Sequence, residues 1–218
     1  MMPERIGETL VRFAFRLVAR GLFRIRVVGY ENIPCRGPAL LAANHVTFLD
    51  GFIIGFLVRP VVRFLVWRPY YRLRLFNWAL RLAYAIPVGD GPHDLAGSIR
   101  RARHGLEKGE IVCIFPEGFI TRTGNLLPFK RGLEKIIHGL NVPIIPIHLD
   151  GLWGSIFSFG GRGVFWKWPR HLRQPVTVSF GAPMPASSTA NDVRQAIQDL
   201  DAGIDAGEMA RTLAGRPA

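Results

Sequence analysis

The sequence has few cysteines and no long uninterrupted apolar run. Two cysteines, Cys35 and Cys113, occur in 218 residues. They cannot build a disulfide framework, and they favour a reducing compartment. Because no stretch of about 18 uncharged apolar residues is found, we expect no transmembrane helix. Residues 1–30 carry arginine throughout and lack a clean apolar segment with a cleavage site, so we also expect no signal peptide.

Acidic residues are scarce relative to basic ones. The chain has 28 Lys+Arg against 16 Asp+Glu, a net charge of +12, and almost all of the cations are arginine. This excess predicts an anionic partner, which could be a nucleic acid, a membrane surface or a phosphorylated substrate. Hydrophobic residues make up 49% and charged residues 20%. These values exclude a disordered, collagen-like or coiled-coil chain.

Apolar runs bounded by turn residues alternate with helical patterns along the chain. We expect strands at 24–30, 38–43, 84–88, 111–115, 142–149 and 175–180, and helices at 94–108, from near Thr47 and from Asp192. Such alternation predicts an α/β fold with a central, mostly parallel or mixed sheet flanked by helices. We divide the chain into an amphipathic basic helix within 1–24 and a single domain over 25–218.

Two basic segments are rich in aromatic or bulky apolar residues. In the predicted helix over 6–24, arginine recurs every fourth residue beside a wide Phe/Leu face. That pattern is typical of a helix lying in the plane of an anionic bilayer, although a core helix with a solvated arginine edge is the alternative. Residues 59–82 interleave arginine with aromatic rings. This composition suits a membrane interface or the stacking of nucleic acid bases.

The segment NHVTFLD (44–50) joins an expected buried strand to an expected helix. Positions five apart diverge by about 140° on a helix, so His45 should precede it. With Thr47 as N-cap and Asp50 at the third helical position, the carboxylate would point back toward His45. Asp50 could then accept one imidazole N–H and leave the other nitrogen as a base. Alternatively, Thr47 and Asp50 form only a capping box.

A second polar segment, FPEGFITRTG (115–124), closes the expected strand at 111–115. Gly118 allows close backbone approach, and Arg122 can bind a phosphate with two parallel hydrogen bonds. Lys130 follows a few residues later. The segment therefore predicts an anion-binding turn, with a solvated loop as the alternative. His148 and Asp150 have no further ligand cluster beside them, so we expect no metal site.

Together, NHxxxxD (44–50), AIPV (85–88), FPEG (115–118) and VPIIPI (142–147) resemble the glycerolipid acyltransferases of the lysophosphatidic acid acyltransferase type. The resemblance covers roughly residues 25–185. It implies an acyltransferase domain that moves an acyl group from acyl-CoA or acyl-carrier protein to the free hydroxyl of 1-acyl-sn-glycerol-3-phosphate. It implies no bound cofactor, no metal and no covalent acyl-enzyme.

The resemblance also implies roles for individual residues. His45 would be the general base and Asp50 would orient it. The phosphate or glycerol region of the acceptor would be contacted by Asn44, Glu117, Gly118, Arg122 and Lys130. The partners would be the acyl donor and a membrane phospholipid surface. We therefore expect a peripheral or monotopic protein on the cytoplasmic face of the membrane.

The sequence departs from the family's pattern at two places. Phe119 and Ile120 separate FPEG from Thr121-Arg122, a form that resembles the branch acting on 2-acylglycerophosphoethanolamine. A lysophosphatidylethanolamine-type acceptor is therefore the alternative. Many relatives carry an arginine where this chain has Gly89-Asp90, a contact that Arg81 or Arg100 could replace. The aromatic segment 153–169 could line an acyl channel, face a membrane or form a surface hairpin.

Two readings from other classes compete with an acyltransferase. A nucleic-acid-binding protein would explain the charge, but the sequence has no helix-turn-helix, zinc-finger, RRM or KH signature. Its basic residues are also spread among very hydrophobic segments, which favours lipid over nucleic acid. A non-catalytic lipid-binding protein could keep the fold, but the intact pair of His45 and Asp50 argues against that reading.

Overall fold

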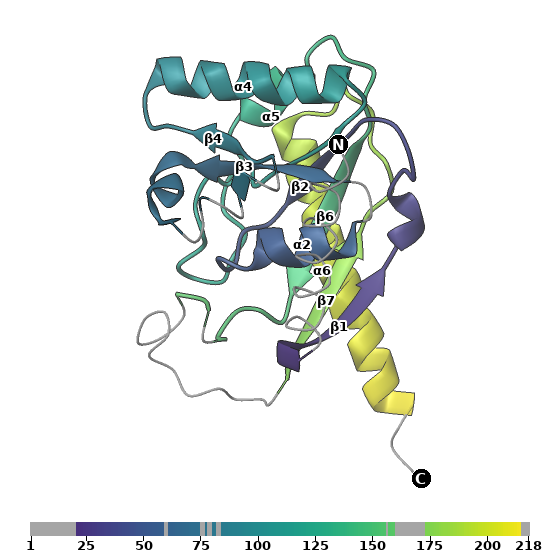
Figure 1. The fold of residues 1–218 in the computed structure, drawn as a ribbon. Coiled ribbons are helices and arrows are strands. Elements are labelled where there is room, and N and C mark those ends of the chain that lie inside the picture. Colours follow the sequence, from purple (N-terminus) through teal and green to yellow (C-terminus); the bar gives the residue numbers. More distant parts are fainter. Residues whose placement is uncertain are drawn as a thin grey trace, which may run out of the picture.

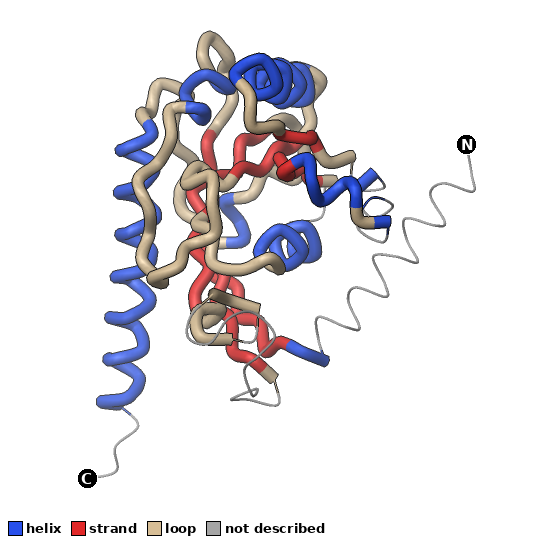
Figure 2. The backbone as a smooth tube through the Cα atoms, turned by 90° about the vertical axis from the view of Figure 1, so that its left-hand side faces the viewer, coloured by secondary structure: helices blue, strands red, loops and turns tan. Residues whose placement is uncertain are grey.

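The computed structural model describes residues 21–58, 61–74, 77, 80–81, 84–155, 157–159 and 173–214, with the backbone alone over 205–214. Most of the predicted basic helix at 6–24 and most of the aromatic segment 153–169 lie outside the described residues. The described elements form a mixed sheet with helices on both of its faces, as Figures 1 and 2 show.

Seven strands make the sheet, in the spatial order β1-β7-β6-β2-β5-β3-β4. They are β1 (Phe23–Val28), β2 (Ala39–Ala43), β3 (Val62–Trp67), β4 (Ile86–Val88), β5 (Ile111–Ile114), β6 (Ile144–Asp150) and β7 (Gln174–Phe180). Strands β6, β2, β5, β3 and β4 run parallel, whereas β7 is antiparallel to β6 and parallel to β1. The mostly parallel α/β fold predicted from the sequence is confirmed.

The described helices are α2 (Asp50–Leu57), α4 (Pro92–Glu107), α5 (Gly132–Ile137) and α6 (Ala190–Ala214), with 3₁₀ turns η1 (Tyr30–Asn32) and η2 (Arg68–Arg72). Strand β2 is fully buried, and its side chains alternate between two cores. Leu41 packs in the core shared with α2, while Leu40 and Ala42 pack in the core shared with α4, α5 and α6. Figure 2 shows α2 and α6 on opposite sides of the strands.

Strand β3 corrects the interpretation of residues 59–82 as an interfacial surface. The strand lies inside the sheet between β5 and β4, and Val62 and Phe64 are buried. Arg63, which interrupts the apolar pattern, pairs with Glu110 at 2.7 Å. Helix α2 can approach β3 closely because its Gly55 has no side chain. A Cβ at this position would stand only 3.2 Å from the Phe64 ring. Part of the arginine–aromatic stretch is therefore core.

Parallel strands end at one edge of a sheet, where ligands commonly bind in α/β folds. Strand β2 ends at Ala43, two residues before His45, and the neighbouring β5 ends at Ile114, directly before the FPEG turn. On its other side, β2 pairs with β6, which ends at Asp150. The sheet thus brings both predicted polar segments to the same carboxyl edge.

Candidate active site

His45 and Asp50 form the hydrogen-bonded pair that the sequence predicts. The imidazole Nδ1 lies 2.8 Å from Oδ2 of Asp50. Asp50 is fully buried, and its carboxylate also accepts the Val46 N–H at 2.6 Å, the Thr47 N–H at 2.9 Å and the Thr47 hydroxyl at 2.5 Å. The carboxylate therefore orients the histidine and holds the turn before α2, so the two alternative interpretations of Asp50 are compatible.

The local helix start differs from the prediction. Helix α2 begins at Asp50 itself with Leu49 as its N-cap, so Thr47 is not the cap and Asp50 is not at the third position. The reason is that the Thr47 N–H and hydroxyl both donate to Asp50, which folds 46–49 into a turn before the helix. A carboxylate at the first position of a helix is favoured by the helix dipole.

The hydrogen bonds define what the imidazole can do. An ionised carboxylate only accepts, so Nδ1 of His45 carries the proton that it donates to Asp50. The lone pair on Nε2 is then available to take a proton from a ligand. Phe115 stacks on the ring with 4.0 Å between the centroids, and the side chain keeps 20% of its exposure. His45 is thus held rigidly yet open to a substrate.

Glu117 belongs to the same site, but its contacts are with backbone groups. Its Oε1 accepts the N–H of His45 at 2.6 Å, and its Oε2 accepts the N–H of Leu127 at 2.8 Å. The residue keeps only 3% of its exposure. Burial raises the pKa of Glu117 above its ordinary value, and the two N–H groups oppose that rise by favouring the carboxylate.

Asn44 likewise bonds to the backbone. Its amide nitrogen donates to the carbonyl of Leu149 at 3.0 Å, and its amide oxygen accepts the N–H of Leu149 at 2.7 Å. The buried side chain therefore extends the pairing of β2 with β6 by one residue beyond Ala43. A substrate contact of Asn44 stays a prediction, and its observed part is to fix the residue before the histidine.

Gly118 and Lys130 lie together at the FPEG turn. Gly118 has φ +77°, a left-handed conformation that favours glycine, and a Cβ there would stand 2.6 Å from Nζ of Lys130. That ammonium group also lies 4.2 Å from the ring centroid of the exposed Phe119. Only a residue without a side chain lets the lysine come so close to the turn.

Arg122 reaches the start of α2 through aromatic side chains. Its guanidinium carbon lies 5.5 Å from the ring centroid of Phe159, and that ring lies 5.6 Å from the ring of Phe48. Thr47 also pairs with Ser158 in an isolated bridge. The described part of the aromatic segment 153–169 is therefore packed against the histidine-bearing turn. Phosphate contacts of Arg122 and Lys130 remain predictions.

Sequence reasoning missed three contributions to the site. Thr121 donates its N–H to the carbonyl of His45 at 2.9 Å, and Leu127 donates to Glu117. Phe115 forms the stacking wall of the imidazole. Position at a strand end was a usable signal for Phe115. Thr121 and Leu127 act through backbone N–H groups, which leave no trace in residue type.

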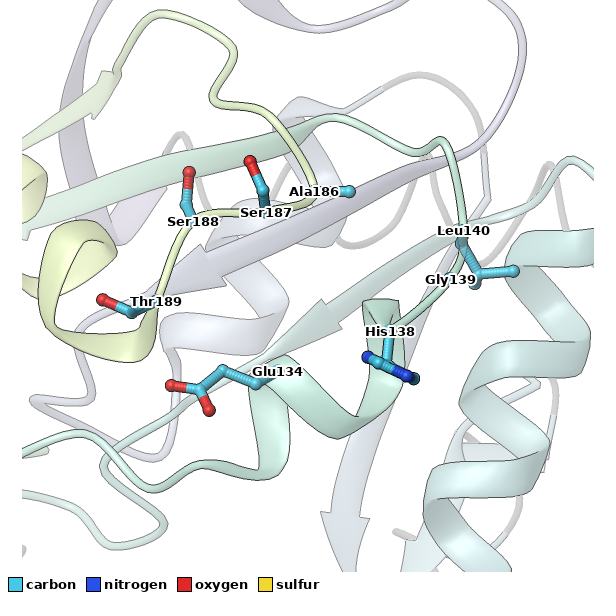
Figure 3. A pocket seen from close by; sticks show the side chains of 8 residues that line it. All are labelled: Glu134, His138, Gly139, Leu140, Ala186, Ser187, Ser188 and Thr189. Atoms are coloured by element: carbon cyan, nitrogen blue, oxygen red, sulfur yellow. The ribbon is translucent and has the colours of Figure 1, made fainter.

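Among the described residues, no group of three or more His, Cys, Asp or Glu side chains could hold a metal ion. A cavity of about 420 Å³ lies where α5 ends and α6 begins (Figure 3), lined by Glu134, His138, Gly139, Leu140, Ala186, Ser187, Ser188 and Thr189. Because Leu140 precedes β6, this cavity lies at the amino edge of the parallel strands, away from His45.

Curated relatives are similar over much of the chain. A 1-acyl-sn-glycerol-3-phosphate acyltransferase of Bacillus subtilis is 28% identical over 188 residues, 83% of this chain and 90% of the relative. One of Pseudomonas aeruginosa is 33% identical over 150 residues, 65% of this chain and 56% of the relative. A chloroplastic one of Brassica napus is 28% identical over 144 residues, 65% of this chain. The chain spans about two fifths of the length of that plant relative.

The fold of the chain and its match to a family model agree with this similarity in sequence. The crystal structure of a 1-acyl-sn-glycerophosphate acyltransferase from Thermotoga maritima superposes with a TM-score of 0.68 at 21% sequence identity, covering 100% of this chain and 86% of that one. The likeness shows a shared fold. The family model described as Acyltransferase matches residues 24–150, more than half of the chain. This segment includes the paired His45 and Asp50 and the FPEG turn, and the chain belongs to the acyltransferase family.

Proposed function

We propose that the chain transfers a fatty acyl group from an acyl thioester to the free hydroxyl of 1-acyl-sn-glycerol-3-phosphate. The observation that carries the proposal is the pair of His45 and a buried Asp50, with Nε2 left available as a base. Membership of the acyltransferase family supports the reaction class. The relatives from Bacillus and Pseudomonas are named 1-acyl-sn-glycerol-3-phosphate acyltransferases, which supports this acceptor.

The proposed reaction uses His45 twice. Nε2 accepts the proton of the acceptor hydroxyl while the oxygen attacks the thioester carbonyl. The tetrahedral intermediate collapses, the C–S bond breaks, and the imidazolium returns the proton to the departing thiolate. Asp50 keeps the imidazole in the required tautomer and stabilises the transient imidazolium. No acyl-enzyme forms, and the acyl donor is acyl-CoA or acyl-carrier protein.

The acceptor's phosphate requires cations near the histidine. Arg122 and Lys130 come from the loop that leaves the FPEG turn, and both side chains are exposed. A guanidinium binds phosphate with two hydrogen bonds, and an ammonium adds a point charge. We assign both to the phosphate. Gly118 supports the assignment because it lets Lys130 lie directly against the turn.

A lysophosphatidylethanolamine-type acceptor is the second candidate. The observation in its favour is the insertion of Phe119 and Ile120 before Thr121-Arg122. Phe119 is 68% exposed and covers the ammonium of Lys130 with its ring. An ammonium group already satisfied in part by a ring attracts the doubly charged phosphate monoester of 1-acyl-sn-glycerol-3-phosphate less strongly, which reduces the advantage of that acceptor over a singly charged phosphodiester.

We further propose that the protein works at the cytoplasmic surface of a membrane, with the predicted helix within 1–24 as one contact. None of the described helices is long and apolar enough to cross a bilayer. At the carboxyl edge, Trp67, Leu73 and Phe119 are about half exposed or more, and Arg72 and Arg74 are exposed beside them. Aromatic rings at headgroup depth with nearby guanidinium groups suit an anionic lipid surface.

An acyl-transfer assay tests the proposed reaction. Purified full-length protein in detergent receives labelled acyl-CoA or acyl-carrier protein with one of four acceptors: glycerol-3-phosphate, 1-acyl-glycerol-3-phosphate, lysophosphatidylethanolamine or lysophosphatidylglycerol. We expect diacyl product chiefly from 1-acyl-glycerol-3-phosphate. Preference for lysophosphatidylethanolamine would favour the second candidate. Absence of product with every donor and acceptor, from folded protein, would contradict both.

Vesicle sedimentation tests the membrane contact. We expect more protein to pellet with vesicles that contain phosphatidylglycerol than with phosphatidylcholine alone, and less to pellet at high salt. Trp67→Ser with Leu73→Ser should reduce binding, whereas Val28→Ser, at an exposed position on β1, should not. Equal binding by both variants would remove this edge from the membrane contact.

A further inference from the structure

The residues around His45 leave its backbone outside any strand. The last residue pair between β2 and β5 is Ala42 with Ile114, and Ala42 lies three residues before His45. Yet the segment is mostly buried, and buried backbone N–H and C=O groups must find partners. The FPEG loop supplies both: the carboxylate of Glu117 accepts the His45 N–H, and the N–H of Thr121 donates to the His45 carbonyl.

Glu117 connects this histidine to a second segment. Its other oxygen accepts the N–H of Leu127 at 2.8 Å, three residues before Lys130. One carboxylate therefore joins the residue that carries the base to the chain that leads to a proposed phosphate ligand. Each bond has a charged acceptor in a site nearly without solvent, where such bonds are strongest.

The same geometry leaves Glu117 poorly placed to meet a substrate. Each of its carboxylate oxygens already accepts a short hydrogen bond, and the residue keeps 3% of its exposure. The exposed residues at the turn are Gly118, Phe119 and Lys130. A ligand reaching the turn would meet these residues first.

We propose that Glu117 is a positioning residue, which fastens the backbone of His45 to the segment around Leu127 and does not contact the acceptor. This inference rests on the proposed acyl transfer by His45. We call the two hydrogen bonds of Glu117, from the N–H groups of His45 and Leu127, the clasp. Loss of the clasp frees the backbone that carries the base, while Lys130 stays held by its own N–H bond to the carbonyl of Pro116. Misplacement of reacting groups by about 1 Å can cost about 100-fold in rate.

Glu117→Gln removes the clasp with the smallest change in shape. An amide cannot accept on both sides, so its NH₂ would face either the His45 N–H or the Leu127 N–H. Glu134→Gln is the matched control. Glu134 also accepts a distant backbone N–H, that of Ala190 at 3.0 Å, but at the amino edge of the strands.

Separate measurement of kcat and of the KM for the acceptor distinguishes a positioning residue from one that contacts the acceptor. For Glu117→Gln we expect kcat to fall by about 10- to 100-fold while the KM for the acceptor stays within about twofold, and for Glu134→Gln we expect neither to change. In a His45→Ala background, Glu117→Gln should lower the residual rate no further. A large rise in the acceptor's KM with kcat unchanged, or an added loss in the His45→Ala background, would overturn the proposal.

Amide hydrogen exchange reads the clasp without any turnover. We expect the His45 and Leu127 amides to exchange slowly in the wild type and in Glu134→Gln, and quickly in Glu117→Gln. Unchanged exchange in a folded Glu117→Gln would overturn the clasp. If the glutamine variant does not fold, Glu117→Asp serves both measurements, because its shorter carboxylate can reach only one donor. A wild type with slow exchange but no acyl transfer would refute the proposed reaction and leave the clasp standing.

Discussion

At each edge of the parallel strands, one glutamate accepts a backbone N–H from a distant segment of the chain. At the carboxyl edge, Glu117 accepts the N–H groups of His45 and Leu127 and is 3% exposed. At the amino edge, Glu134 accepts the N–H of Ala190 and the guanidinium of Arg131, and its side chain is 27% exposed. The two carboxylates accept similar hydrogen bonds, and they differ in their exposure to solvent.

The difference appears in the pKa values of the two carboxyls. Burial raises the pKa of Glu117, whereas the N–H of Ala190 and the Arg131 side chain lower the pKa of Glu134. A buried carboxylate lowers the free energy of unfolding unless its oxygens accept hydrogen bonds. Among the residues that the structure describes, the buried carboxylates lie at the edge that holds His45. Two buried carboxylates there, Glu117 and Asp50, fix one histidine from its backbone and from its ring.

A second pair of regions makes the same contrast with histidines. His45 lies 2.8 Å from a fully buried Asp50, while Nε2 of His148 lies 3.6 Å from the half-exposed Asp201. A close pair away from water orients an imidazole firmly. A looser, wetter pair contributes about 0–1 kcal/mol. Proximity of a histidine and an aspartate alone therefore does not define the site.

The largest effect should come from Asp50→Asn. The amide cannot accept from the ring Nδ1–H, the two backbone N–H groups and the Thr47 hydroxyl together. We expect acyl transfer to fall by about 10²–10⁴-fold, which is the usual contribution of a general base. Asp201→Asn should change the rate by less than about twofold. Equal losses in steady-state assays of the two variants would erase the contrast between the two pairs.

Arg122→Ala should weaken acceptor binding. Hydrogen bonds to a charged group contribute about 1.5–3 kcal/mol, so we expect the KM for the acceptor to rise by about 10- to 100-fold with a smaller change in kcat. Arg26→Ala, at an exposed position on β1, is the matched loss of one positive charge. If titrations of acceptor concentration gave the same KM for both variants, Arg122 would not bind the phosphate.

The two glutamates should give opposite pH dependences of stability. A raised pKa means that the folded state holds its proton longer, so Glu117 lowers the free energy of unfolding as pH rises above its ordinary 4.5. A lowered pKa means that the unfolded state holds the proton longer, so Glu134 raises stability as pH rises toward 4.5.

Urea unfolding of the wild type and each glutamine variant across this pH range checks the signs. The wild-type advantage over Glu117→Gln should shrink with rising pH above 4.5, and its advantage over Glu134→Gln should grow with rising pH below 4.5. If the free energy of unfolding depended on pH in the same way for both variants, exposure to solvent would not distinguish the two glutamates.

The smallest effect is expected from thiol labelling. Cys35 is exposed, whereas Cys113 is fully buried in β5 and burial raises the pKa of its thiol. A maleimide should therefore modify Cys35 quickly and Cys113 only after denaturation. Acyl transfer should be unchanged by the first modification. Rapid labelling of both thiols, seen by mass spectrometry, would mean that the strand beneath the site opens readily.

Much of the fold was predictable because apolar runs alternate cleanly. The runs at 38–43 and 111–115 became β2 and β5, the two neighbours that carry the site. Strand β3 and the short helix α5 were missed. In β3 the cation of Arg63 breaks the apolar pattern, and its charge is balanced by Glu110, a residue far along the chain. Pairing between distant residues cannot be read from local composition.

The candidate site divides in the same way. His45 and Asp50 were predictable because they lie five residues apart and share one turn. The part of Glu117 was not, since its bond to His45 spans 72 residues and ends on a backbone N–H. Asn44 was expected to contact substrate, but its observed bonds are with the backbone of Leu149. Residue type indicated that these side chains belong to the site, but it did not show which groups they bond to.

The most direct test of the account is acyl transfer by His45→Ala beside His104→Ala, an exposed histidine on α4. Both variants would be assayed with acyl-CoA and 1-acyl-glycerol-3-phosphate after their folding has been checked by thermal unfolding. We predict that His45→Ala loses about 10²–10⁴-fold in rate while His104→Ala keeps wild-type activity. Wild-type activity in folded His45→Ala would contradict the central claim that this histidine is the base.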